Sequence, residues 1–119
     1  MEAHKISINT CDGFPVVTIE GDMTSESDDT IMSLFSSIKE STSLSSLIFD
    51  FEKTTYINSA GIATLINIIQ EMKDLGGKVL FTGLSDHFQK VMDIVGISDF
   101  VTIYDTISHA LQANKNDIN

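Results

Sequence analysis

A short apolar strand, a polar turn and an amphipathic helix follow one another directly in the middle of this chain. Residues 47–51 form an apolar run with two aromatic side chains, which is typical of a buried strand. After a turn that begins at Lys53, apolar residues recur at the spacing of one helix face; they are Ile62, Leu65, Ile66, Ile69 and Met72. A buried strand that leads into such a helix predicts an α/β fold, because the apolar face of the helix has to cover a sheet.

The same alternation of strands and helices extends along the rest of the chain. Residues 5–10 and 14–20 are predicted strands, and the Asp12-Gly13 turn between them favours an antiparallel hairpin. Further strands are predicted at 78–82 and 101–104, and further helices from Thr24 or Ser25, over 84–95, and from a cap at Asp105 through Leu111. The sequence therefore predicts an α/β fold with a mixed sheet of about four to five strands, opened by an N-terminal hairpin, and about four helices.

The length and the charge of the chain limit the functions that it could have. The 119 residues suit a single domain over 1–119, with a core at about 5–111 and a polar tail at 113–119. Seven basic against 17 acidic residues leave a formal charge of -10, which disfavours binding to nucleic acid or to an anionic membrane surface. The single Cys11 excludes an internal disulfide, and no apolar run is long enough to insert into a membrane. We therefore expect a cytoplasmic protein.

The turn from strand to helix at Asn58-Ser59-Ala60-Gly61 holds the candidate functional residues. Asn58 or Ser59 can accept a hydrogen bond from the first free N–H groups of the helix that follows. The Ser59 hydroxyl would then lie exposed at the positive end of the helix dipole, where the helix tolerates a phosphate group. The alternative is that Ser59 only caps the helix, as most serines in this position do.

The residues of this turn also carry a family resemblance. Residues 56–65 read Tyr-Ile-Asn-Ser-Ala-Gly-Ile-Ala-Thr-Leu, which resembles the signature loop and helix of STAS domains, in particular of bacterial anti-sigma factor antagonists. The stretches 88–100 and 103–110 are also similar to that family, so the resemblance extends over roughly residues 5 to 111. It implies the STAS fold, and it implies that Ser59 is the serine that a partner kinase phosphorylates.

The resemblance also implies the partners and their binding surface. An anti-sigma factor that is also a serine kinase would bind the unphosphorylated chain, and a serine phosphatase would reverse the modification. The partner-binding residues would be Asn58, Ser59, Ala60, Gly61 and Thr24. Two of them depart from the family, which usually has Asp at the positions of Asn58 and Thr24.

Signals of enzyme chemistry are weak throughout the sequence. The three histidines have no metal-binding spacing, there is no nucleotide-binding or nucleophile motif, and nothing nominates a base for Ser59. The prediction is a non-enzymatic protein without a cofactor or metal. Two alternatives remain: a STAS scaffold or accessory subunit of a larger signalling or transport assembly without switching at Ser59, and a small enzyme or nucleotide-binding protein.

Overall fold

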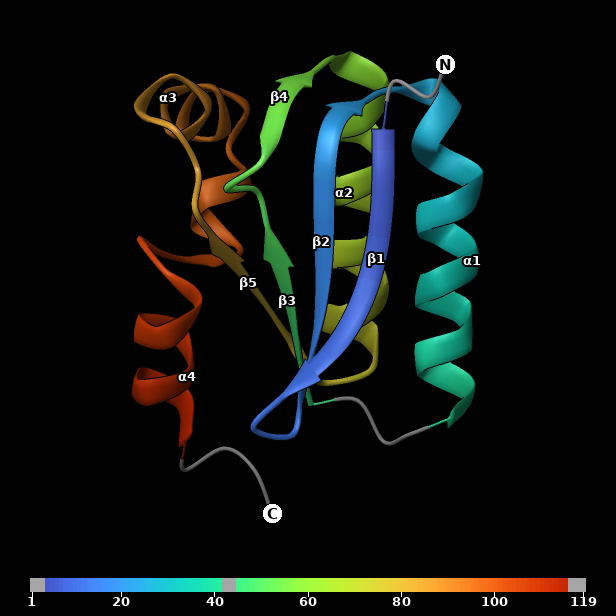
Figure 1. Cartoon of the computed structure of the whole chain (residues 1–119), viewed down its shortest axis with the longest axis vertical. Coiled ribbons are helices and arrows are strands. Elements are labelled where there is room, and N and C mark those ends of the chain that lie inside the picture. The colour runs from blue at the N-terminus through green and yellow to red at the C-terminus, as the bar shows by residue number, and fades with distance from the viewer. Residues whose placement is uncertain (1–3, 42–44, 116–119) are drawn as a thin grey trace.

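A computed structural model describes residues 4–41 and 45–115, which form one twisted sheet with helices on both faces (Figure 1). The strands are β1 (His4–Cys11), β2 (Phe14–Met23), β3 (Ser46–Asp50), β4 (Thr54–Ile57), β5 (Lys78–Thr82) and β6 (Thr102–Tyr104). The helices are α1 (Ser25–Ser41), α2 (Ser59–Asp74), α3 (Asp86–Val95), the short 3-10 helix η1 (Ile97–Asp99) and α4 (Ile107–Asn114). The predicted α/β fold with a mixed sheet is confirmed.

The sheet has the strand order β1-β2-β3-β5-β6, and only the β1–β2 pair is antiparallel. The predicted hairpin turn is confirmed: Asp12 and Gly13 have φ angles of 50° and 87°, as a tight two-residue hairpin turn requires. Its register pairs Cys11 with Phe14. The hairpin, which precedes the first helix in the chain, therefore forms one edge of the sheet.

Strand β4 was not predicted, and it makes the sheet six-stranded. The long strand β2 pairs with β3 along its first part and with β4 along its last part, with a shift of register between Gly21 and Asp22. The segment after β3 is predicted to be a turn, but after three residues the chain continues as a strand in parallel with the end of β2. This places the start of α2 beside the start of α1 (Figure 1).

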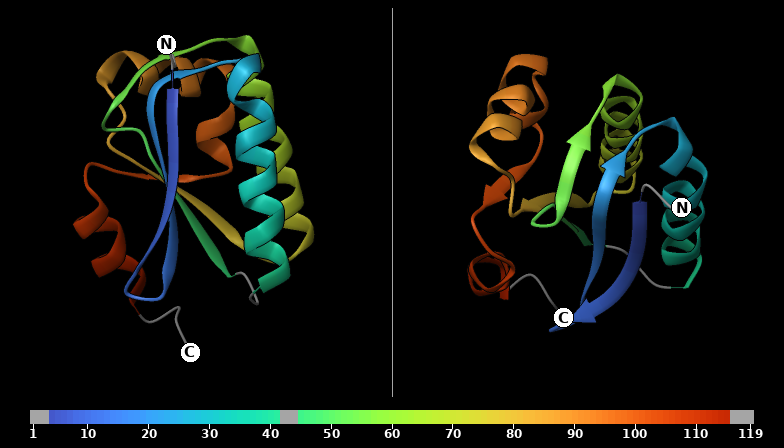
Figure 2. Two further views of the ribbon diagram at one scale, coloured as in Figure 1. Left: turned by 45° about the vertical axis from the view of Figure 1, so that its right-hand side comes forward. Right: turned by 45° about the horizontal axis from the view of Figure 1, so that its top comes forward.

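Side chains on alternate positions of the strands build two cores, one on each face of the sheet. The larger core lies under α1, α2, α3 and η1, and contains Val17, Leu47, Phe49 and Phe81 among its strand residues. The smaller core lies under α4 and contains Val16, Ile48, Leu80 and Ala110 among others. Figure 2 shows α1 and α2 together on one side of the sheet and α4 on the other.

The helix ends are formed by glycines and by polar caps. Gly76 and Gly96 take the left-handed conformation that ends α2 and α3. Ser85 caps α3, and its hydroxyl accepts a hydrogen bond from the N–H of Phe88. The prediction that Asp105 caps α4 is wrong, because Thr106 holds that position and accepts from the N–H of His109.

Candidate functional site

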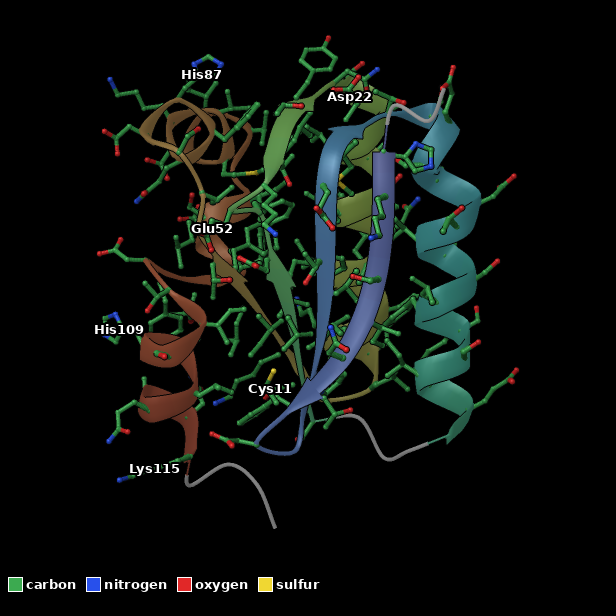
Figure 3. All side chains as sticks on the ribbon, viewed as in Figure 1. Cys11, Asp22, Glu52, His87, His109 and Lys115 are labelled. Atoms are coloured by element: carbon green, nitrogen blue, oxygen red, sulfur yellow. The ribbon has the colours of Figure 1, made fainter. Side chains whose placement is uncertain are left out.

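The predicted site residues lie at the edge of the sheet where the parallel strands end and the helices begin. The backbone N–H of Asn58 donates to the carbonyl oxygen of Met23 at 3.2 Å, so the turn between β4 and α2 is bound to the turn between β2 and α1. Figure 3 shows Asp22 at this edge, next to the first turns of α1 and α2. The structure therefore brings Thr24 close to Asn58 and Ser59, although more than thirty residues separate them in the chain.

Asn58 is the N-cap of α2, and this resolves which of the two candidates plays that role. Its backbone is extended (φ -99°, ψ -175°), and its side-chain Oδ1 accepts a hydrogen bond from the N–H of Gly61 at 3.0 Å. Ser59 is the first helical residue and is exposed. Its hydroxyl has no hydrogen bond to a described residue, so the helix start does not depend on it.

Gly61 is buried under this turn and adds no side chain or exposed surface to it. A Cβ atom at this position would lie 2.4 Å from the carbonyl oxygen of Met23 and 3.1 Å from Cγ2 of Ile57. Glycine is thus required because the first turn of α2 packs directly on the backbone at the end of β2. Partner binding by Gly61 stays a prediction, and any larger side chain at this position would also disturb the packing of α2 on β2.

Thr24 caps α1, so it has a structural role of its own beside the site. Its Oγ1 accepts from the N–H of Glu26 at 3.2 Å, while the Ser27 hydroxyl accepts from the N–H of Thr24 at 3.0 Å. This is a reciprocal capping arrangement. Thr24 and Ala60 are both half-buried, which leaves the Ser59 hydroxyl as the most accessible polar group among the predicted site residues.

Two features of the site were not selected from the sequence. Tyr56 is 52% exposed, an unusual state for an aromatic side chain of a strand, and it pairs in register with Asp22. Thr55 Oγ1 donates to Asp22 Oδ1 at 3.2 Å. Ile57 at the end of β4 is buried, and its neighbour Tyr56 faces outward. The sequence does not predict a strand here, so it does not predict the outward position of Tyr56 either.

Among the described residues, no group of three or more His, Cys, Asp or Glu side chains is placed to hold a metal ion. No described base forms a hydrogen bond with Ser59. None of the helices within residues 4–41 and 45–115 combines the length and the apolar character needed to cross a membrane.

Comparison with known proteins identifies the family. The sequence profile of the STAS domain matches residues 5–110. The chain belongs to the STAS domain family. A protein of Thermotoga neapolitana, provisionally named an anti-sigma factor antagonist and a homologue of TM1081, is 30% identical over 56 residues, which are 47% of this chain and 50% of that protein. The chain thus spans about half the length of the curated relative it matches.

Solved structures share the STAS fold over nearly the whole chain. The anti-sigma factor antagonist SpoIIAA in its unphosphorylated form has a TM-score of 0.73 and 16% identity, with 98% of this chain and 100% of that chain covered. A sulfate transporter family protein of Wolinella succinogenes has a TM-score of 0.78 and 19% identity, with 91% of this chain and 89% of that chain covered. At such identities, the likeness shows that the fold is that of the anti-sigma factor antagonists and occurs in a transport protein as well.

Proposed function

We propose that this STAS protein is a protein-binding switch of the anti-sigma factor antagonist type, controlled by phosphorylation of Ser59. In its unphosphorylated form it binds an anti-sigma factor that is also a serine kinase, and this sequestration releases a sigma factor. The kinase then modifies Ser59 with its own ATP and magnesium, and a serine phosphatase restores the binding form. The chain itself needs no catalytic group, cofactor or metal for this role.

One observation carries the proposal: Ser59 is exposed at the first position of α2, while the neighbouring Asn58 performs the capping. A kinase can therefore modify the hydroxyl without removing a hydrogen bond that the fold uses. The free N–H groups of the first helical turn favour an anion at this end of α2. Phosphorylation of Ser59 should accordingly leave the domain folded.

Release of the partner follows from the charge that the phosphate adds. A phosphoserine carries about -1.5 to -2 charges near neutral pH. When the surface around Ser59 is covered by a partner, that charge loses its hydration, and it also meets any acidic group of the partner at close range. The complex then separates without a change of fold. The structure of SpoIIAA is known in both an unphosphorylated and a phosphorylated form, which supports this type of switch for that protein.

The departures at Asn58 and Thr24 fit a site with altered kinase recognition. Both residues keep the capping oxygen that the helix starts require. Neither supplies the negative charge of the Asp that the family usually has there. We therefore expect the fold of the site to be preserved, while the rate of phosphorylation or the partner affinity differs from that of family members with Asp.

The test is phosphorylation by a candidate kinase. The full chain is incubated with anti-sigma factor kinases from its own organism, ATP and magnesium, and the product is analysed by peptide mass spectrometry. We expect phosphate at Ser59, none in the Ser59→Ala variant, and weaker binding of the kinase to the phosphorylated chain in calorimetric titration. If Ser59 stays unmodified and Ser59→Asp binds the kinase as tightly as wild type does, the switch is rejected.

A second candidate is a scaffold or accessory subunit of a larger signalling or transport assembly, with no switching at Ser59. The neutral residues at Asn58 and Thr24 favour it, and so does the likeness to a sulfate transporter family protein. Size-exclusion chromatography of the tagged protein from its own cells distinguishes the two candidates. A complex with one small ATPase-like partner supports the switch, and a multi-subunit particle that survives replacement of Ser59 supports the scaffold.

A further inference from the structure

An apolar groove runs between α2 and the segment formed by the end of α3 and η1. It consists of two adjoining hollows with volumes of about 300 and 270 Å³. Ile69, Lys73 and Phe100 line both of them. On the α2 side, the residues of the first hollow are Ile66, Ile69, Gln70 and Lys73. Their spacing is that of one face of a helix, so the groove follows the axis of α2.

The rim of this groove exposes large apolar side chains. Phe100 is 63% exposed and Val95 is 46% exposed, and both line the first hollow. Ile94, which is 83% exposed, lies next to Val95 on α3. Scattered exposed apolar residues need no explanation, but two that line the same hollow, with a third next to them on α3, mark an interaction site. A small ligand would bury most of its surface in a closed pocket, whereas this open rim suits a segment of a protein.

The charge of the groove differs in sign from that of the chain. Its described charged residues are Lys73, Lys78 and Asp99, which sum to +1, whereas the formal charge of the whole chain is -10. Lys73 forms no ion pair with a described residue, and it lies where the two hollows meet. A carboxylate that approaches the groove would therefore find a cation beside an apolar surface.

We propose that this groove is a docking site for an amphipathic helix of a partner protein, which inserts two or three apolar side chains beside Phe100 and Val95 and places a carboxylate on Lys73. A helix is the occupant that fits an elongated groove between two helical elements, because its apolar side chains recur along one face. A second copy of this chain is disfavoured, because two chains of charge -10 repel each other.

This docking site is separate from the surface around Ser59. Ser59 starts α2, and the groove begins at Ile66, which is about 10 Å further along the helix at 1.5 Å per residue. Lys73 lies about 21 Å from Ser59 by the same measure. Binding in the groove therefore does not rest on the proposed switch. A helix bound there would stay bound when Ser59 carries a phosphate.

The test uses designed helical peptides of about 15 residues, because isolated helices shorter than about 12–15 residues are only marginally stable in water. One peptide has Leu at i, i+3 and i+7 with Glu beside them, and a matched peptide has Lys in place of each Glu. Each is titrated into the full ¹⁵N-labelled chain and followed by amide chemical shifts. We expect saturable shifts at Ile66, Gln70 and Gly96 with the Glu peptide, and weaker binding of the Lys peptide by about tenfold or more.

Substitutions in this chain test whether the peptides bind in the groove. Phe100→Asp should abolish the shifts, whereas Leu75→Asp, a matched change at a 54% exposed residue outside the groove, should leave them intact. Lys73→Glu should reverse the preference, so that the Lys peptide becomes the tighter ligand. Circular dichroism melting of each variant confirms that it is folded, which the exposure of Phe100 and Leu75 favours.

Several outcomes would overturn the proposal. One is the absence of saturable shifts with either peptide, or shifts confined to residues outside the groove. Another is equal binding of the Glu and Lys peptides. Shifts at the groove with decanoate but with neither peptide would assign it to a small amphiphilic carboxylate instead. A concentration-dependent dimer that Phe100→Asp disrupts, measured by analytical ultracentrifugation, would assign it to a second copy.

Discussion

The first turn of α2 and the turns that follow it are held in place by different interactions. The N-terminal turn is fixed by directional contacts: the Asn58 cap, the backbone hydrogen bond from Asn58 to Met23, and the close approach that Gly61 permits. The following turns are fixed by burial, since Leu65 and Ile68 are fully inaccessible and form part of the larger core. The first turn fixes the position of the helix start, and the following turns supply most of the favourable free energy from buried apolar surface.

This difference explains how α2 could carry the proposed phosphorylation site without loss of the fold. Ser59 belongs to the end whose stability depends on Asn58 and on the backbone, and its own hydroxyl is not used. The groove lies along the later turns of α2, where one side of the helix packs in the core and another side lines the groove. Substitutions along α2 should therefore have effects on stability that fall steeply from the core to Ser59.

The largest effect is expected from Ile68→Ala. Ile68 is completely buried on the core side of α2, and removal of three carbon atoms leaves a cavity in the core. We expect a loss of about 2–5 kcal/mol in the free energy of unfolding, measured by urea denaturation. The matched control is Asn67→Ala at the exposed neighbouring position, for which a change within about 0.5 kcal/mol is expected. Equal effects of the two variants would contradict the described orientation of α2.

Gly61→Ala should have the next largest effect. The added methyl group meets the carbonyl oxygen of Met23 at 2.4 Å, and because this atom belongs to the backbone, α2 must shift. We expect a loss of about 1–3 kcal/mol in denaturation experiments. Ala63→Ser, which adds one atom on the exposed face of the same helix, serves as the control. A Gly61→Ala variant as stable as wild type would show that the packing at the end of β2 is looser than described.

Substitutions of Asn58 should have a smaller effect on stability. Comparing Asn58→Ala with Asn58→Asp separates the contribution of the cap from that of a negative charge. Asn58→Ala removes the acceptor for the N–H of Gly61 and should cost about 1 kcal/mol. Asn58→Asp keeps the acceptor and places a carboxylate at the helix N-terminus, so its thermal stability should be nearly that of wild type. We expect the Asp variant to differ instead in the rate of Ser59 phosphorylation or in partner affinity. A large loss of stability without any change in binding would refute this division of roles.

The smallest effect on stability is expected at Ser59. Since Asn58 is the cap, Ser59→Ala should change the free energy of unfolding by less than about 0.5 kcal/mol. Ser59→Asp should stabilise α2 by about 0.3–1 kcal/mol, because a carboxylate is favourable at a helix N-terminus. If Ser59 is the switch, the Ala variant binds the partner and the Asp variant does not, as measured by calorimetry. Parallel changes in stability and binding would argue against a switch.

Local sequence signals predicted those parts of the fold that depend on nearby residues. The Asp12-Gly13 turn and the apolar face of α2 each follow from residues only a few positions apart. Strand β4 could not be predicted in this way. It has four residues and no apolar run, and it is a strand only because the end of β2, more than thirty positions earlier, pairs with it.

The sequence places the candidate residues at a turn from strand to helix, but it does not show which of them caps the helix. Asn58 and Ser59 are adjacent and both form good caps, so the sequence left open which of them performs the capping. The role of Gly61 was out of reach for a related reason. The atom that excludes a side chain there belongs to Met23, on a different strand, and only the packing of α2 against β2 brings the two together.

The placement of β4 has a consequence for how the domain opens. β3 is flanked by strands on both sides, whereas β4 pairs with β2 and with no other strand in the described part of the chain. A strand held along one edge can detach at a lower free energy than the global unfolding of the domain, and its amide hydrogens then exchange with solvent sooner. Because Asn58 follows β4 directly, such an opening would carry Ser59 away from the surface of the sheet. If a kinase modifies Ser59 as proposed, it would then meet this residue in a locally opened segment rather than on a packed face.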